Sequence, residues 1–325
     1  MKKSLIFVGM AALVLGACHK VDIVVTETPQ EIGFKAISAN ATKANELVGT
    51  LLTKDYSIYA SATQKNTAGT IENPAFFVDQ QFQTADAEVT ASSEYRAWNG
   101  TAAAPIYWPV GGVTIDFLAY AVPTAVYKAG TVKGVWSNTT DIASGVSFTW
   151  NTSDNQVDLL YAANNAATRE KGNVNMSFKH AQALLAFQAK TGVADAITIK
   201  SITVNGVKVY GTFTVDNSRN ELVASWSDFG EAIDRPITSS PCDLTDTYAM
   251  VGETLLVPQQ PKCNFTIEYT MGNSKPMKYT YNETRGTWEM GKKYIYQLDM
   301  KLNEIILTEN VKDFVDAAVP EIPLN

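Results

Sequence analysis

Residues 197–215 read ITIKSITVNGVKVYGTFTV and set the pattern for the whole chain. Ile197 and Ile199 alternate with polar residues and, after one slip, so do Ile202 and Val204. A period of two is typical of a strand with one buried face. Asn and Gly both tolerate positive φ, so residues 205–206 predict a tight hairpin to a second strand over 209–215.

Short apolar runs of the same kind, separated by Gly, Asn, Asp, Ser, Thr and Pro, recur in both directions from this stretch. Further strands are predicted at 56–61, 75–82, 113–121, 145–150, 175–190, 221–226, 254–258, 264–271, 277–281 and 294–302. Residues 216–220 predict a second hairpin turn. Evenly spaced short strands with little helical periodicity indicate an all-β protein built of β-sandwiches.

Length and composition exclude several classes of protein. The chain has 325 residues, 46% of them hydrophobic, which is enough for two domains. Its net charge of −7 argues against nucleic-acid binding, which needs a basic face. A polar stretch at 162–173, AANNAATREKGN, has no apolar face and is the predicted domain boundary.

The N-terminus has the pattern of an export signal. Lys2 and Lys3 precede an apolar run over 5–17, which is too short to span a bilayer. The run ends in Leu-Gly-Ala before Cys18, which looks like the lipobox of bacterial lipoproteins. We therefore predict a signal peptide over 1–17 and lipidation of Cys18; the alternative is an ordinary signal peptide with a chance cysteine. No later segment reaches transmembrane length.

The remaining chemistry of the sequence does not point to an enzyme. Cys242 and Cys263 are candidates for a disulfide that closes a loop of about twenty residues, stabilising by about 3 kcal/mol; two separate buried thiols are the alternative. His180, between apolar residues, is interpreted as a structural histidine, because no nucleophile motif accompanies it. The sequence predicts no catalytic residues, no metal site and no cofactor.

Several short motifs, in order and at characteristic spacing, resemble the fimbrillin family, the lipoprotein pilins of Gram-negative gut and oral bacteria. Besides Cys18, they are residues 41–44 (ATKA), 107–109 (YWP), 113–120 (VTIDFLAY), 158–162 (DLLYA), 176–181 (MSFKHA), 255–259 (LLVPQ), and 288 with 291–294 (GKKY). The resemblance covers roughly residues 18–315. It implies two tandem transthyretin-like β-sandwiches, an N-terminal one over 44–172 and a C-terminal one over 173–310.

The resemblance also implies assembly by strand exchange, in which a first strand is removed by proteolysis and a neighbour's C-terminal strand replaces it. The removable segment here is 18–43, with Ile32, Phe34 and Ala36 on one face of the displaced strand. The candidate cleavage site is Lys43–Ala44. Family members are cleaved after arginine, so a lysine-tolerant protease or no cleavage are both open, and Lys43 as a plain loop residue is the alternative.

The predicted donor is the C-terminal tail over 311–325, which follows a last strand beginning at Ile305. Its candidate donor residues are Val311, Phe314, Val315, Ala318, Val319, Ile322 and Leu324. Two alternatives stay open: a strand docked in the subunit's own sheet, and a short helix.

The sequence as a whole predicts a pilin of a cell-surface fimbrium, exported to the outer membrane as a lipoprotein and contributing to adhesion. Its expected partners are other fimbrial subunits, in a homo- or hetero-polymer, the outer membrane through the lipid, and a host or bacterial surface ligand. A surface lipoprotein that binds glycans without polymerising is the alternative, and clustered exposed tryptophans would mark it.

Overall fold

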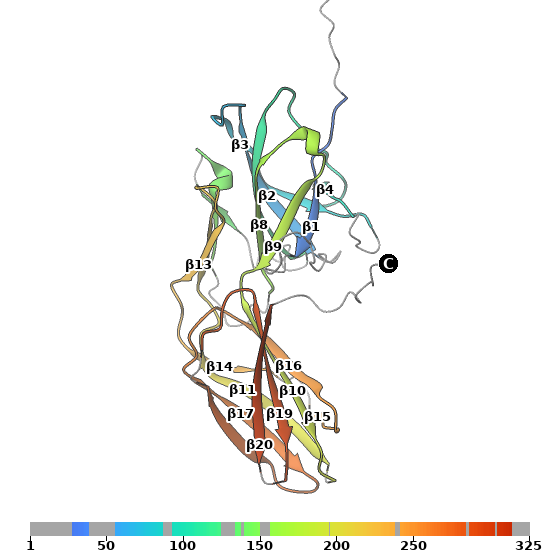
Figure 1. The fold of residues 1–325 in the computed structure, drawn as a ribbon, viewed down its shortest axis with the longest axis vertical. Helices are drawn as coiled ribbons and strands as arrows, with labels where there is room; N and C mark the ends of the chain where they lie inside the picture. Colours follow the sequence, from blue (N-terminus) through green and yellow to red (C-terminus); the bar gives the residue numbers. More distant parts are fainter. Residues whose placement is uncertain are drawn as a thin grey trace, which may run out of the picture.

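The computed structural model describes residues 28–38, 56–86, 93–124, 134–137, 140–149, 157–194, 196–237, 241–283, 286–302 and 304–313. These residues form twenty strands and two short 3-10 helices, at Ile142–Ser144 and Arg169–Lys171. The all-β prediction is confirmed. Two β-units follow one another along the long axis of the molecule (Figure 1). Neither described helix has the length and apolarity needed to cross a membrane.

The first unit is a closed barrel with the strand order β1-β4-β3-β2-β5-β8-β9. Its strands are β1 (Gly33–Ser38), β2 (Tyr56–Lys65), β3 (Ile71–Gln83), β4 (Tyr95–Trp98), β5 (Thr114–Pro123), β8 (Leu160–Ala167) and β9 (Val174–His180). Alternate residues of β5, among them Ile115 and Phe117, fill the barrel interior. Leu118 and Tyr120, which have the opposite parity along β5, are also buried, but they face outward into a second apolar cluster.

A small sheet covers this outward face of the barrel. It has the order β13-β12-β7-β6 and consists of β6 (Val135–Trp136), β7 (Gly145–Thr149), β12 (Thr212–Asp216) and β13 (Val223–Ser227). Phe148 of β7 and Phe213 of β12 are buried with Tyr120 in this cluster. Because β5 is apolar on both faces, it requires such a cover.

The second unit is a sandwich of two sheets, one ordered β16-β10-β19-β20 and one β14-β11-β17-β18, with β15 also paired to β11. The strands are β10 (Ala183–Thr191), β11 (Ile197–Val207), β14 (Ile233–Pro236), β15 (Cys242–Asp243), β16 (Ala249–Leu256), β17 (Cys263–Met271), β18 (Met277–Glu283), β19 (Lys292–Met300) and β20 (Ile305–Asp313). Phe187 and Phe265 meet between the sheets, with ring centroids 5.1 Å apart.

The hairpin predicted at Asn205–Gly206 is wrong. β11 continues through both residues to Val207, with Gly206 at φ 73° and a register shift between Val204 and Val207. β12 does not return along β11 but crosses to the first unit and pairs with β7. The second predicted turn, at 216–220, does join two paired strands, β12 and β13.

The polar stretch predicted as the domain boundary starts as a barrel strand. Ala162 and Ala167 of β8 are buried, and Asn165 on the other face exchanges hydrogen bonds of 3.2 and 2.7 Å with Asn217. The single strand predicted over 175–190 is two strands, because β9 closes the barrel and β10 enters the sandwich. The first β-unit therefore extends beyond residue 172 and also takes in the β12–β13 hairpin.

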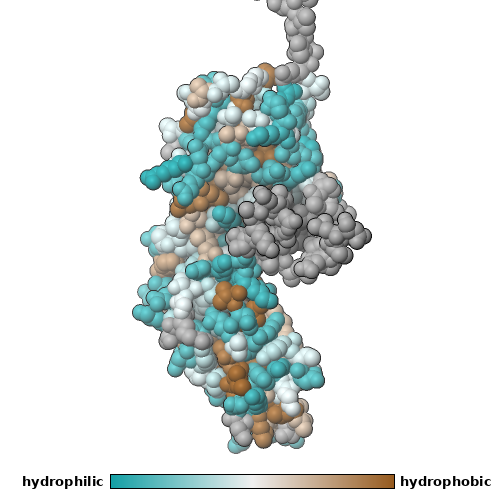
Figure 2. All heavy atoms as spheres, in the orientation of Figure 1, coloured by the Kyte–Doolittle hydropathy of each residue, from teal (hydrophilic) through white to brown (hydrophobic). Residues whose placement is uncertain are grey.

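On the face seen in Figure 2, hydrophilic residues cover most of both units, and hydrophobic residues form small separate patches. Most large apolar side chains of the described residues are buried in three internal clusters.

Candidate functional site

The backbone of β1 closes the barrel between β4 and β9. It runs parallel to β9, from Phe34 opposite Val174 to Ser38 opposite Phe178. On its other side it pairs with β4 only at Gly33 and Phe34. Just before β1, Ile32 N donates to Ile106 O at 2.7 Å and Gln30 O accepts from Trp108 N at 2.9 Å. We call the surroundings of residues 28–38 the β1 seat.

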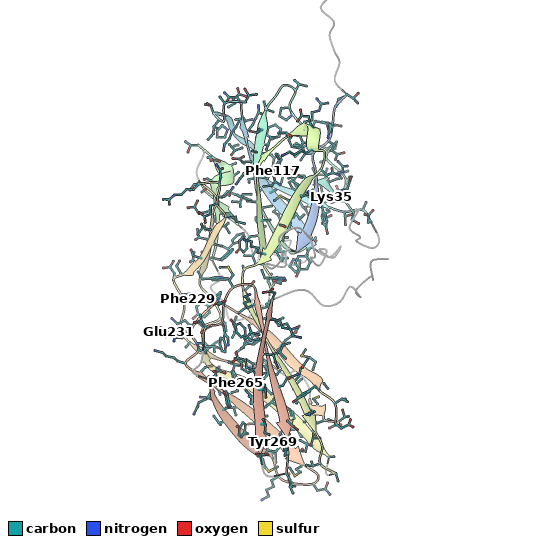
Figure 3. The ribbon with its side chains drawn as sticks, viewed as in Figure 1. Lys35, Phe117, Phe229, Glu231, Phe265 and Tyr269 are labelled. Atoms are coloured by element: carbon teal, nitrogen blue, oxygen red, sulfur yellow. The ribbon has the colours of Figure 1, made fainter. Side chains whose placement is uncertain are left out.

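Two apolar side chains anchor this segment in the barrel. Ile32 and Phe34 are each 0% exposed, and the Phe34 ring lies 4.3 Å from Phe82 and 5.4 Å from Phe117 between centroids. Figure 3 labels Phe117 inside the upper unit and Lys35 on β1. Burying each such side chain stabilises by roughly 1.5–3 kcal/mol.

The predicted displaced strand is thus a real strand of the structure. Ala36 belongs to it and pairs with Met176. Of the three residues predicted on the inner face of this strand, Ile32 and Phe34 are buried as expected.

Charged and amide side chains surround the point where the chain enters the β1 seat. Arg169 Nη2 donates to Thr28 O at 2.5 Å, and Gln30 Nε2 donates to Arg169 O at 3.1 Å. Arg96 lies 3.9 Å from the Glu31 carboxylate. Arg96 also pairs with Glu94, which accepts in turn from Asn173.

Sequence reasoning missed these polar residues. Arg169 and Asn173 lie in the stretch predicted as the domain boundary, and Arg96 stands in a four-residue strand that no apolar pattern revealed. Only the closing of the barrel brings β4 and the β8–β9 connection together around residues 28–31, so no local signal could have found these residues.

The C-terminal strand β20 is an edge strand of the sandwich. It pairs with β19 over nine residue pairs, from Lys292 opposite Asp313 to Met300 opposite Ile305. Lys292 Nζ donates to Asp313 Oδ1 at 2.5 Å, and this hydrogen bond raises the pKa of Lys292 above its usual value. A last strand beginning at Ile305 was predicted, and the structure has it.

Val311, predicted as a donor residue, is part of this strand. It lies opposite Tyr294 in its own subunit's sheet, which is the second of the three alternatives for the tail. The other candidate donor residues lie outside the described residues. They are Phe314, Val315, Ala318, Val319, Ile322 and Leu324. The predicted lipidation site Cys18 and the predicted cleavage site Lys43–Ala44 lie outside them as well.

The predicted disulfide does not form in this structure, where Cys242 and Cys263 are both free thiols. β15 and β17 flank β11 on opposite edges, because Ile199 pairs with Cys242 on one side and with Tyr269 on the other. Cys263 lies at the far end of β17, next to Asn264, which faces Asn205. Cys242 is therefore level with Ile199 and Cys263 lies near the level of Asn205, which is six residues further along β11, or roughly 20 Å. A disulfide needs the two Cα atoms within about 7 Å of one another.

His180, interpreted as a structural histidine, and Asp216, in the predicted turn at 216–220, both form hydrogen bonds within the fold. His180 is 2% exposed and its Nδ1 lies 2.8 Å from Asp158 Oδ1. Asp216 Oδ1 accepts from Ser218 N at 2.7 Å within the β12–β13 turn, and hydrogen bonding to Ser218 lowers the pKa of Asp216. In the described part of the chain no three His, Cys, Asp or Glu side chains gather at a possible metal site.

The tryptophans form no exposed platform among the described residues. Trp108 and Trp288 are buried, and Trp98, Trp136 and Trp226 are half-buried. Trp136 Nε1 donates to Asp79 at 3.0 Å, and Trp226 Nε1 donates to Ala181 O at 2.7 Å. Trp108, Trp136, Trp226 and Trp288 are therefore used in packing, Trp98 is half-buried, and Trp150 lies outside the described residues.

Comparison with known proteins identifies relatives of this architecture. A family model described as fimbrillin-like matches residues 40–313. The sequence matches no curated protein. A fimbrial protein from Bacteroides vulgatus has 16% sequence identity and a TM-score of 0.59, with 87% of this chain and 99% of that chain covered.

Two further solved structures, described as candidate cell adhesion proteins, have the same fold. The one from Bacteroides ovatus has 15% identity and a TM-score of 0.55, covering 90% of this chain and 99% of that one. The one from Bacteroides uniformis has 16% identity and a TM-score of 0.54, covering 87% and 97%. At these identities the likeness extends to the fold and no further.

Proposed function

This chain belongs to the fimbrillin-like family, and from that premise we propose that it is a structural subunit of a cell-surface fimbrium, assembled by exchange of β1. In this proposal the chain is exported as a lipoprotein through Cys18 to the outer membrane. Cleavage at Lys43–Ala44 then releases β1, and a strand from another fimbrial subunit occupies the β1 seat. The fibre contributes to adhesion.

The observation that supports the proposal most is the position of β1. It is one strand of a barrel, it carries the fully buried Phe34 directly after the fully buried Ile32, and its removal would open the hydrogen-bonding edges of β4 and β9. Strand addition uses main-chain hydrogen bonds for affinity and alternate side-chain pockets for specificity. The β1 seat offers both.

The energy of such an exchange depends on the apolar side chains. A strand gains on the order of 0.5–1.5 kcal/mol per hydrogen bond, and ordering the chain costs about 1–2 kcal/mol per residue. These two terms roughly cancel. The pockets of Ile32 and Phe34, each contributing roughly 1.5–3 kcal/mol, therefore decide whether an incoming strand stays.

The tail after Asp313 is the proposed donor. β20 ends at Asp313 in its own sheet, which leaves residues 314–325 for a neighbouring subunit. A chain with both a removable first strand and a donor tail fits a stalk position in the fibre. Its partners are then copies of itself or other fimbrial subunits.

A reversible covalent lock on β1 tests the proposal. Lys35 and Asn175 are directly opposite one another, and neither is a buried residue. We expect the variant Lys35→Cys/Asn175→Cys, when oxidised in the producing bacterium, to yield no laddered polymer on unboiled gels, and reduction to restore it. The matched control is Thr214→Cys/Ser225→Cys in the β12–β13 hairpin, which should polymerise with or without reduction.

Polymer formation by the locked chain would refute strand exchange at the β1 seat. The N-terminus of the protein in filaments is the second readout. A start at Ala44 supports the stalk role. Lipidated Cys18 on a chain that forms no filaments would favour the non-polymerising surface lipoprotein instead.

A further inference from the structure

The end of the chain resembles the sequence that enters the β1 seat, and the first two of the four residues compared are identical. Residues 31–34 read Glu-Ile-Gly-Phe, and residues 321–324 read Glu-Ile-Pro-Leu. We infer that the C-terminal residues 321–325 of one copy occupy the places of residues 31–35 in the next copy, in the same direction and register. This inference rests on the proposed strand exchange and specifies its register.

The apolar side chains of the two segments correspond. Ile322 would enter the pocket of Ile32, an identical side chain that is fully buried. Leu324 would enter the pocket of Phe34, which is lined by Phe82 and Phe117. Leu is smaller than Phe, so it fits this pocket without overpacking.

The charged residues correspond as well. Glu31 lies 3.9 Å from Arg96 at the entrance to the seat, and Glu321 has the same place in the repeated sequence. Once Glu31 leaves with β1, Arg96 keeps only its partner Glu94. An incoming Glu321 restores the lost ion pair, and a wrongly placed tail would leave the pair unmade.

The two prolines of the tail fall where the seat tolerates them. Pro320 corresponds to Gln30, whose carbonyl is the group that accepts from Trp108 N, and proline keeps its carbonyl. Pro323 corresponds to Gly33. The N–H of Ile32 donates to Ile106 O. Because successive N–H groups of a strand point to opposite sides, the N–H of residue 33 points toward β9. Pairing between β1 and β9 begins only at Phe34. The missing N–H of proline costs no ladder bond there.

Pro323 does bring a Cβ that Gly33 lacks. A Cβ at Gly33 would meet Asn173 Oδ1 at 2.7 Å and Arg96 Nη1 at 2.9 Å. Both atoms are at the ends of flexible side chains, and both side chains lie at the mouth of the seat rather than in the barrel core. A small rotation of each accommodates the ring.

Substitutions in the tail test the register, and they leave β20 and the subunit's own sheets unchanged. In the producing bacterium we expect Ile322→Asp and Leu324→Asp each to reduce the laddered polymer at least tenfold. Asn325→Asp introduces the same side chain at the position of Lys35, which has the opposite parity, and should change the polymer less than twofold. A larger effect of Asn325→Asp than of Ile322→Asp would overturn the register.

A charge exchange tests the pairing of Glu321 directly. Arg96→Glu should lower the polymer yield, and adding Glu321→Arg should restore it, whereas adding Asp316→Arg should not. Rescue by Asp316→Arg instead would place a different part of the tail at Arg96 and overturn the inference. Thermal unfolding of each purified variant shows whether Arg96→Glu folds, and the tail substitutions decide the register if it does not.

Deletion of 314–325 separates this inference from the proposed function. If the deletion leaves the ladders intact, the tail is not the donor and the proposed function fails with the inference. If the deletion removes the ladders while Ile322→Asp and Leu324→Asp do not, strand exchange stands and only the register is wrong.

Discussion

Phe34 is the residue on which the seating of β1 depends most, because its ring is fully buried against Phe82 and Phe117. We expect Phe34→Ala to lower the free energy of unfolding by about 3–5 kcal/mol, through lost burial and the cavity it leaves. Urea denaturation of the uncleaved chain measures this. Lys35→Ala, on the outer face of the same strand, should stay within about 0.5 kcal/mol of the parent; equal losses for both would contradict the assigned faces.

The two cysteines should differ in reactivity, as separate thiols in different surroundings. Cys263 is 7% exposed, and burial, followed by the nearby Glu283 charge, raises the pKa of its thiol to about 12. Cys242 is half-buried. At pH 8 we expect iodoacetamide to modify Cys242 in the folded protein well before Cys263, as peptide mapping would show.

Denaturation provides the control for this prediction. In urea both thiols should react at similar rates, since the burial that protects Cys263 is lost. Resistance of both cysteines to alkylation in unreduced, denatured protein would contradict the free thiols and restore the disulfide.

At the scale of one element, the end of β20 depends on the Lys292–Asp313 hydrogen bond. We expect Asp313→Asn to speed amide exchange at residues 311–313 about 1.4- to 5-fold at pH 7, because a partly exposed ion pair contributes about 0.2–1 kcal/mol. Hydrogen-exchange mass spectrometry measures this. Glu304→Gln, which breaks the exposed Lys301–Glu304 pair, should leave these amides unchanged.

The same pair has a defined pH dependence. Asp313 raises the pKa of Lys292, so the charged lysine is favoured in the folded state. Its contribution is fully present below the pKa of the unfolded chain, near 10.5, and disappears as the pH rises through the higher folded value. The difference between the parent and Asp313→Asn should therefore shrink in strongly alkaline solution.

The two predicted turns, at 205–206 and at 216–220, show when a local pattern is enough to predict how strands pair. The turn at 216–220 was predictable because both strands it joins pair with each other. The continuation of β11 through Asn205 and Gly206, where a turn was predicted, could not be foreseen, because β12 pairs with β7, more than sixty residues earlier in the chain. Phe213 and Val215 of β12 are buried against the outside of the barrel, a surface that no local pattern reveals.

At the scale of the whole molecule, the chain passes between the two units three times: at β9–β10, at β11–β12 and at β13–β14. Trp226 Nε1 adds a hydrogen bond to Ala181 O at the first crossing. We therefore expect one cooperative unfolding transition by calorimetry. Phe213→Ala should lower its midpoint by on the order of 10 °C.

Two separate transitions, with Phe213→Ala lowering only the transition of the first unit, would contradict this coupling. Val223→Ala is the matched control, because Val223 lies on the outer face of the neighbouring strand and is exposed. Its substitution should leave the midpoint nearly unchanged.

The sequence by itself determined the all-β class, most of the strands, the apolar face of the first strand and the start of the last one. Those features follow from a period of two and from turn residues, which are local. The tertiary structure alone decided that β1 closes a barrel, that the β12–β13 hairpin belongs to the first unit, and that Cys242 and Cys263 stay apart. Periodicity shows which face of a strand is buried, but the partner depends on apolar surfaces distant in the chain, and only folding brings those together.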